Sequence, residues 1–470
     1  MKNNLIKDKR VKDLIYTLGA NTITLLIGVI VTFIIPKVIS IDEYGYFKMF
    51  TFYLGFLGFF HLGFNDGIYV NYGDYDYENI PREKFRTYFK FLLIFQVLIA
   101  VLVTIGTMIF VENPQKRIIC FFVALNIILL NLTCYFEFLS QIIRRFKFYS
   151  FNTILSKILY IVAVSFILLL KYEKAIYLII AQTIINLLTL LIYIIYYREV
   201  NFGKYKPLIT MKEDIKKNIK IGFFIMLGNF VSIIIIGVDR IFISKFFTVH
   251  DFAMYSFAVS LLSMIYILLN GIRSVIYPYL TRSSEKNLNK TYETMKTYIF
   301  IILGYALSSY FIFEIIVLGF LPKYKEVLYI TPIIFPTVLL SGEINIVTSN
   351  FYKSLKLEKE YTRNNLIAVA VSLISIVIAF LVFRSKEAIA TSSLLSFYIW
   401  ELCGDGFFKK HLGIKVSKHH IAEILVIVLF LYLSFKMVWY KGFILYLCGF
   451  TLIVLIFFKN EIKGLLEKRR

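Results

Sequence analysis

The chain has 470 residues, of which 59% are hydrophobic and 17% are charged. An ordinary soluble domain is roughly 45–50% apolar and about 25% charged. The composition therefore argues against a soluble globular protein and predicts a polytopic membrane protein. The net charge of +22 comes from 52 Lys and Arg against 30 Asp and Glu. In a membrane protein this excess indicates basic connectors on the cytoplasmic side and no nucleic-acid partner.

Apolar segments long enough to span a bilayer recur along the whole chain, since a spanning helix needs about 20 apolar residues. They predict an all-α polytopic membrane protein with about fourteen transmembrane helices and short connectors. Twelve spans are the alternative, if one hairpin is misread. The predicted spans, in chain order, are residues 13–36, 44–69, 85–111, 117–142, 147–170, 174–197, 218–243, 251–276, 295–321, 327–352, 364–383, 388–408, 419–437 and 441–458.

The first apolar run, Leu14 to Ile35, is too long for the h-region of a signal peptide, so we expect it to be retained as a span. Placing the N-terminus inside puts most of the 52 basic residues on the inner side, including Lys216-Lys217 and Lys409-Lys410. This bias predicts a multi-pass protein of the cytoplasmic membrane with both termini cytoplasmic. The outer connectors, such as Val111–Lys116, are short and predict no extracytoplasmic domain.

The chain also shows a weak internal repeat. When the chain is slid along itself, Ser40 aligns with Thr248 and Glu43 with Asp251, each pair before or at the start of a span. An offset of six spans preserves orientation, so these would be parallel repeats, a plan in which transporters place the substrate between the halves. Accidental similarity of two hydrophobic hairpins is the alternative.

Two stretches carry a family resemblance. Ile35–Phe50 followed by Leu62–Asp74 resembles the opening of polysaccharide-exporting flippases, with a tyrosine–glycine pair in the first outer loop and a glycine-rich end to the second span. Gly237–Leu261 resembles the matching element of the second half, although Ala253 stands where that motif usually has glycine. The family is that of oligosaccharide flippases of the O-antigen or capsule type. Its superfamily also holds the multidrug-and-toxin extruders and the peptidoglycan-precursor flippase.

The resemblance implies a fold of two six-helix lobes in a V, residues 1–200 and 201–410, followed by two C-terminal helices in residues 411–470. It implies movement of a polyprenyl-diphosphate-linked oligosaccharide from the cytoplasmic to the outer leaflet by alternating access. The energy would come from an H⁺ or Na⁺ gradient or the membrane potential. The implied partners are this substrate, membrane lipids and other polysaccharide-assembly proteins, without a cofactor.

Ionisable residues inside spans are candidates for function because burying a charge in a bilayer is costly. A diphosphate headgroup leaving water needs cationic partners. The candidate substrate-binding cations are Lys48, Lys157, Arg240 and Arg273. Snorkelling to the interface is the alternative for Lys48 and Arg273. Lys157 lies about 15 Å along the helix from its inner end and is harder to explain in that way.

The candidates for ion coupling are Asp66, Glu137, Asp239, Glu314 and Glu343, and Glu401 is a further intramembrane acid. Glu343 follows Pro332 and Pro336, which remove two backbone donors and predict a kinked span. A kinked helix with a buried carboxylate suits a cation or proton site. A structural kink with Glu343 bonded to a neighbouring helix is the alternative. Asp239 and Arg240 are alternatively expected to cap their span near the headgroups.

Asparagines inside spans are candidates for contacts with sugar hydroxyls, namely Asn21, Asn229 and Asn345. Their alternative role is interhelical hydrogen bonding, worth under about 1 kcal/mol each.

Several classes of function lack their motifs. No G-x-x-x-x-G-K-[ST] sequence is present, so no ATP-driven motor is expected. The five histidines are expected to form no metal site, with His419 and His420 solvated in a basic loop. No nucleophile–base pair indicates an enzyme.

An ion-coupled multidrug or cation antiporter of the same fold is the first alternative, kept open by Asp66 and Glu137. A membrane polymerase or acyltransferase is the second, and the short outer connectors argue against it.

Overall fold

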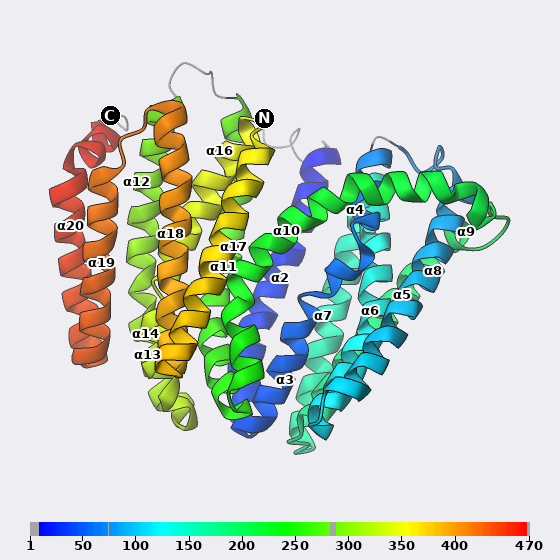
Figure 1. The fold of residues 1–470 in the computed structure, drawn as a ribbon, viewed down its shortest axis with the longest axis horizontal. Coiled ribbons are helices and arrows are strands. Elements are labelled where there is room, and N and C mark those ends of the chain that lie inside the picture. Colours follow the sequence, from blue (N-terminus) through cyan, green and yellow to red (C-terminus); the bar gives the residue numbers. More distant parts are fainter. Residues whose placement is uncertain (1–8, 74, 283–287, 468–470) are drawn as a thin grey trace. The chain divides into compact units, whose positions relative to one another are not determined.

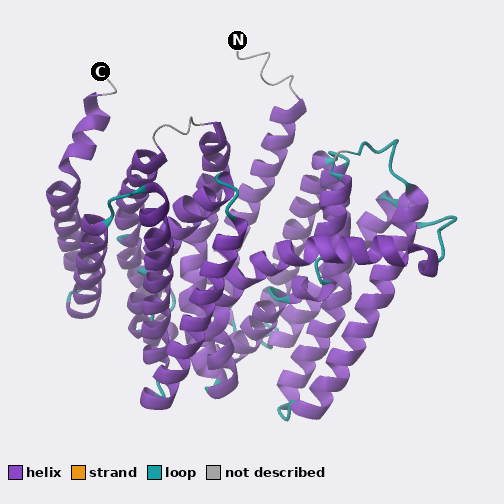
Figure 2. Cartoon of the chain, turned by 45° about the horizontal axis from the view of Figure 1, so that its top comes forward, coloured by secondary structure: helices purple, strands orange, loops and turns teal. Residues whose placement is uncertain are grey.

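The computed structural model describes residues 9–73, 75–282 and 288–467, which are almost entirely helical and include no strand (Figures 1 and 2). The chain divides into two compact units, Met1–Ile233 and Ile234–Arg470. The division falls within α10 (Lys212–Phe246), the helix shared by the two units.

The first unit is built around α6, which packs against α3, α5, α7 and α8. Half of the most apolar window of α6 is buried, against 17% for α5 and 11% for α7. The outer helices thus leave their apolar faces for lipid, while α6 forms the centre. The elements before α10 are α2 (Lys9–Val38), α3 (Ile41–Leu54), η1 (Leu57–His61), α4 (Phe64–Tyr72), α5 (Arg82–Phe110), α6 (Pro114–Ile142), α7 (Phe146–Leu169), α8 (Ala175–Tyr196), α9 (Arg198–Asn201) and η2 (Leu208–Met211).

The second unit is built around the broken span Thr331–Ser354, 89% of whose apolar window is buried. The last two helices, α19 and α20, lie side by side, and both contact α12 (Figure 1). The elements after α10 are α11 (Val249–Arg282), α12 (Leu288–Leu307), α13 (Ser309–Phe320), η4 (Pro322–Tyr329), α14 (Thr331–Ile334), α15 (Thr337–Glu343), η5 (Ile344–Thr348), α16 (Ser349–Ser354), α17 (Glu358–Phe383), α18 (Lys386–Leu412), α19 (Ser417–Lys436) and α20 (Trp439–Glu467).

All fourteen predicted spans lie in helical structure, which confirms the all-α membrane class. The count of fourteen is not confirmed. Among the described residues, ten helices are long and apolar enough to cross a bilayer by themselves, or up to twelve if each of two bent pairs is one span. α18 is not among the ten, and it carries the acids Glu401 and Asp405 inside its length.

The predicted kink before Glu343 is confirmed. α14 ends at Ile334 and α15 begins at Thr337, with Pro336 as its N-cap residue. α15 ends at Glu343 and is followed by the π-helical turn Ile344–Thr348. Such π turns are rare and concentrate at functional sites. The backbone is thus irregular both before and after α15, the helix that ends at this carboxylate.

The residues aligned by the internal repeat have matching structural roles. Ser40 Oγ accepts the backbone N–H of Glu43 at 3.3 Å, and Thr248 Oγ1 accepts that of Asp251 at 3.1 Å. Each hydroxyl thus caps the start of a helix, because the first N–H groups of a helix have no intrahelical partner.

The aligned acids also each bind the first residue of a later helix in their own unit. Glu43 Oε2 accepts the backbone N–H of Ala175, where α8 begins, at 2.6 Å. Asp251 Oδ1 accepts Lys386 Nζ, where α18 begins, at 2.7 Å. This shared arrangement supports the repeat beyond the weak sequence alignment.

The second predicted span is bent by 59° between Ile41–His61 and Phe64–Tyr72. The turn uses left-handed backbone at Leu62 (φ 50°) and Gly63 (φ 77°). Beyond it, α4 packs on the first part of α10 with backbone against backbone. A Cβ on Gly63 would lie 2.3 Å from the carbonyl carbon of Gly222, and one on Gly67 would lie 1.9 Å from the carbonyl oxygen of Asn218.

We expect Gly67→Ala to destabilise the first unit by about 1–3 kcal/mol, because the added methyl group can be accommodated only by moving backbone. The measurement is the melting temperature of the purified protein in detergent. Gly106→Ala in α5 is the matched control, since a Cβ there meets nothing within 4 Å. Equal melting temperatures for the two variants would show that this close contact is absent.

Candidate functional site

The second unit contains a buried cluster of charged side chains centred on Lys296 of α12, which is 1% exposed. Its Nζ lies 2.6 Å from Glu401 Oε1 and forms a shorter contact with Asp405 Oδ2. The same nitrogen lies 3.3 Å from Glu343 Oε2 and 3.7 Å from Glu423 Oε1. One ammonium group is therefore surrounded by four carboxylates from α15, α18 and α19.

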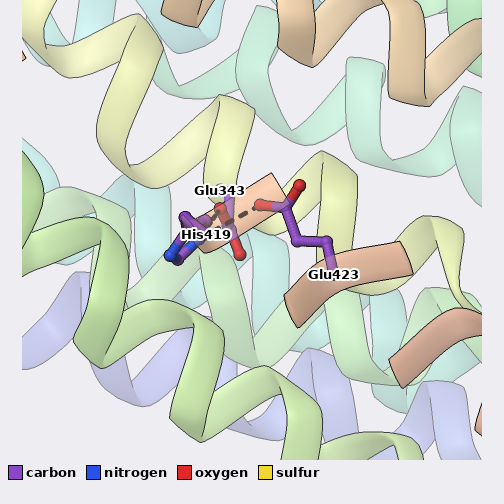
Figure 3. Close-up of side chains that lie close together, drawn as sticks. All are labelled: Glu343, His419 and Glu423. Atoms are coloured by element: carbon purple, nitrogen blue, oxygen red, sulfur yellow. Dashed lines mark hydrogen bonds and ion pairs between the residues drawn. The ribbon is translucent and has the colours of Figure 1, made fainter. Parts of the chain in front are cut away.

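Two histidines at the start of α19 complete the cluster. His419 Nε2 lies 3.0 Å from Glu343 Oε2 and 3.1 Å from Glu423 Oε1, so the three side chains converge (Figure 3). His420 Nε2 lies 3.2 Å from Asp405 Oδ2, and its Nδ1 lies 3.0 Å from Glu423 Oε2. Both ring nitrogens of His420 thus face carboxylate oxygens.

Helical spacing explains how each helix presents its members together. Tyr292 and Lys296 on α12, Glu401 and Asp405 on α18, and His419 and Glu423 on α19 are each four residues apart. Residues at this spacing share one face of a helix. Tyr292 also donates its hydroxyl to Asp405 Oδ1 at 2.6 Å, which joins two of these faces.

This cluster corrects two expectations. His419 and His420 do not lie in a solvated loop: they belong to α19, and His419 is 4% exposed. The histidines were also expected to take part in no metal site, whereas His419, Glu343 and Glu423 each offer one ligand atom within 4.8 Å of the others. The structure therefore gathers a set of side chains suited to hold a metal ion.

Lys296 itself was missed by sequence reasoning. It stands at the second residue of the predicted span 295–321, where a lysine is typical of the membrane interface. The sequence signal for a buried position is that Lys296 stands four residues after Tyr292. Polar pairs with the same spacing occur in two other helices, Glu401 with Asp405 and His419 with Glu423. Glu401 and Glu343 are the two intramembrane acids from the sequence that the structure brings to the cluster.

A pocket of about 270 Å³ reaches the cluster between α12, α19 and α20. Its lining includes Lys296 and His419, with Phe458 of α20. Lys296 and His419 thus line this space although they are almost fully buried.

The other predicted charged residues of the second unit, Asp239, Arg240 and Glu314, lie outside the cluster. Asp239 is buried and accepts the hydroxyl of Tyr255 at 2.6 Å and that of Ser393 at 3.3 Å. Its partners come from α11 and α18, so Asp239 of α10 connects three helices of the second unit. Arg240 and Glu314 are half-buried, on α10 and α13.

In the first unit, the predicted charged residues are not gathered into one cluster. Lys157 of α7 is half-buried and interacts electrostatically with Glu137 of α6. Lys48 Nζ lies 5.3 Å from the centre of the Tyr44 ring. Asp66 Oδ2 lies 3.8 Å from His61 Nε2, near the bend of the second span.

Buried amides in the first unit serve as interhelical hydrogen-bond partners. Asn131 Nδ2 donates to Gln96 Oε1 at 2.8 Å and to the carbonyl of Leu57 at 3.1 Å, while Gln96 Nε2 donates to the carbonyl of Phe60 at 3.1 Å. These bonds satisfy carbonyls of the irregular η1 segment. In the second unit, Asn345 donates to the carbonyl of Ser341 in its own span at 2.8 Å. The side chains of Asn21, Asn229 and Arg273 lie outside the described residues.

We expect Lys296→Met to destabilise the protein by about 3–5 kcal/mol, because it leaves four buried carboxylates without their ammonium partner. Lys290→Met is the matched control, since Lys290 is exposed on the same helix. The measurement is thermal unfolding in detergent. If both variants melt together with the wild type, the cluster does not hold these helices.

Comparison with known proteins identifies the family. The model of the family described as "Polysaccharide biosynthesis protein" matches residues 10–284, more than half of the chain. The protein belongs to this family. The match confirms the resemblance to polysaccharide-exporting flippases. No curated protein matches the sequence of this polysaccharide biosynthesis family member.

Solved structures show the fold of this family member. It is similar to "Lipid II flippase MurJ, inward closed conformation", with a TM-score of 0.68 and 14% identity over 96% of this chain and 100% of that chain. A weaker similarity is to "MATE in complex with Br-NRF", with a TM-score of 0.46 and 14% identity over 86% of this chain and 96% of that chain. The protein is thus a multi-pass membrane protein with a MurJ-like fold.

Proposed function

We propose that this protein is a flippase that moves a polyprenyl-diphosphate-linked oligosaccharide from the cytoplasmic to the outer leaflet by alternating access. Two findings together support this proposal: the family is one of polysaccharide biosynthesis, and the fold resembles a lipid II flippase over 96% of this chain. A flippase for a lipid-linked saccharide satisfies both.

The proposed orientation has both termini in the cytoplasm and rests on the basic connectors. The connector after α8 and the start of α10 are held to α5 by polar contacts: Arg86 Nη1 donates to the carbonyl of Lys204 at 2.9 Å, and Lys84 Nζ lies 2.7 Å from Asp214 Oδ2. Basic residues of α5 and of this connector thus lie near one another, which supports a cytoplasmic location for this connector.

Of the candidate cations for the diphosphate, we favour Lys157. It is half-buried and its carboxylate neighbour Glu137 lies on the adjacent helix. A diphosphate group would replace this carboxylate as the partner of the ammonium, since both are oxyanions. Lys48, Arg240 and Arg273 remain further candidates. Transport of this kind needs no catalytic residue, so we propose a transporter and not an enzyme.

Energy is proposed to come from an H⁺ or Na⁺ gradient or from the membrane potential. Asp66 and Glu137 in the first unit, and Asp239, Glu314 and Glu343 in the second, are the acids proposed for coupling. We expect Asp66→Asn to change the dependence of export on the ion gradient, and unchanged export after collapse of both gradients would remove gradient coupling.

Deletion of the gene tests the function directly. We expect lipid-linked oligosaccharide to accumulate in the inner leaflet of the cytoplasmic membrane, detected by mass spectrometry and by its protection from an added glycosidase in intact spheroplasts. Re-expression of the wild type should remove this accumulation. An unchanged pool of lipid-linked saccharide would contradict the proposal, and a simultaneous loss of resistance to cationic drugs would favour the antiporter.

The role of Lys157 is tested by a double-mutant cycle. We expect Lys157→Ala to lower export roughly tenfold or more, as loss of a charged hydrogen bond would, and Lys157→Arg to retain most of it. The exposed Lys147→Ala on the same helix is the control. If Lys157 serves only to pair with Glu137, the double variant Lys157→Ala/Glu137→Gln will recover export, and the substrate role is then wrong.

A further inference from the structure

The cluster around Lys296 contains more carboxyl groups than ammonium groups among its described side chains. Glu343, Glu401 and Glu423 are 0% exposed, and Asp405 is 1% exposed. Against these four carboxylates stand Lys296 and the imidazole of His420. Each ring nitrogen of His420 faces a carboxylate oxygen. The four carboxyl groups thus share a single ammonium group.

Lys296 is shared unequally among the four carboxyl groups. The ammonium makes its shortest contacts to Glu401 and Asp405, and lies farther from Glu343 and Glu423. Within the part of the chain that the structure describes, Glu343 Oε1, Glu401 Oε2 and Glu423 Oε1 are buried without a hydrogen-bond partner, although Glu423 Oε1 lies 3.1 Å from His419 Nε2. Buried carboxylate oxygens normally have partners, so a bound ion would supply contacts that this cluster lacks.

We propose that Glu343, His419 and Glu423 bind a divalent transition-metal ion. Their ligand atoms lie within 4.8 Å of one another, and His419 Nε2 is 3.0 and 3.1 Å from the two carboxylate oxygens. Two atoms that each lie about 2.1 Å from one zinc ion are roughly 3–3.5 Å apart at angles near or below tetrahedral. The two distances from His419 Nε2 therefore fit a shared ion.

The ligand types select the class of metal. Two carboxylates with one imidazole suit Zn²⁺ or Mn²⁺, whereas Ca²⁺ and Mg²⁺ prefer an all-oxygen set. One divalent ion would also add positive charge where four carboxyl groups share one ammonium group. The ring of His419 is held between Phe300 and Phe458, with ring centres 4.9 and 5.5 Å away, so its nitrogen is directed before the metal arrives.

A pocket adjoins the proposed site. The pocket of about 270 Å³ is lined by His419 itself, and Glu293 and Glu461 also belong to its lining. The ion would tie α15 to α19, so the C-terminal helix pair would be held to the broken span by a metal as well as by hydrogen bonds. This inference goes beyond the proposed flippase activity and does not depend on it.

The test is metal binding by the full-length protein, purified in detergent without a histidine tag and dialysed against chelator. We expect it to take up about one equivalent of Zn²⁺ per chain, measured by mass spectrometry of the metal after dialysis, and to melt at a higher temperature with Zn²⁺ than with Mg²⁺. Absence of Zn²⁺ uptake would overturn the proposal.

Variants locate the ion. We expect His419→Gln and Glu423→Gln each to weaken Zn²⁺ binding by more than about tenfold. Loss of a residue that only hydrogen-bonds a metal ligand already weakens binding by at least about tenfold. The control is His411→Gln, an exposed histidine at the end of α18. Equal affinities for all three variants would place the ion elsewhere and overturn the assignment.

The wild type provides a measurement that does not depend on whether the variants fold. Zinc X-ray absorption should report one imidazole nitrogen with oxygen ligands and no sulfur. Several imidazoles or a thiolate would show binding at other residues and would contradict the site. Because these readouts concern the purified protein, a failure of glycan export and a failure of metal binding are distinguishable.

Discussion

The burial of Lys296 among four carboxylates is the interaction on which the second unit depends. An isolated charge in a bilayer-embedded core is costly, and it persists only when partners with good geometry surround it. Here the partners come from α15, α18 and α19, so the charge can be satisfied only when these helices pack around α12. The C-terminal pair is consequently part of the unit, because α19 supplies both His419 and Glu423 to the cluster.

The irregular backbone of the central span follows from the same requirement. Pro336 separates α14 from α15, and a π turn begins directly after Glu343. Both irregularities are buried in protein, where freed backbone groups can find partners, as the absence of water in a bilayer demands. The breaks in this span thus accompany the placement of the Glu343 carboxylate beside Lys296 and His419.

In the first unit, neutral amide side chains satisfy the backbone carbonyls of the broken span. Asn131 and Gln96 donate to the carbonyls of Leu57 and Phe60, where the second span bends. Glycine at positions 63 and 67 then lets α4 approach the backbone of α10. The two units share the capped start at Ser40 and Thr248 but differ in their interiors, with an amide network described in one and a charge cluster in the other. This difference places the strongest electrostatic site of the described chain in the second unit.

The sequence by itself determined the membrane class, the positions of the helical segments and the family, because each follows from hydrophobic runs or from short local motifs. It also singled out Glu343, since two prolines and an intramembrane acid are visible locally. It did not reveal the cluster. Lys296, His419 and Glu423 lie close to the ends of their spans, where charged residues are ordinary, and helical spacing tells which residues share a face but not which faces meet. Only the packing of α12, α15, α18 and α19 decided that these side chains converge and are buried together.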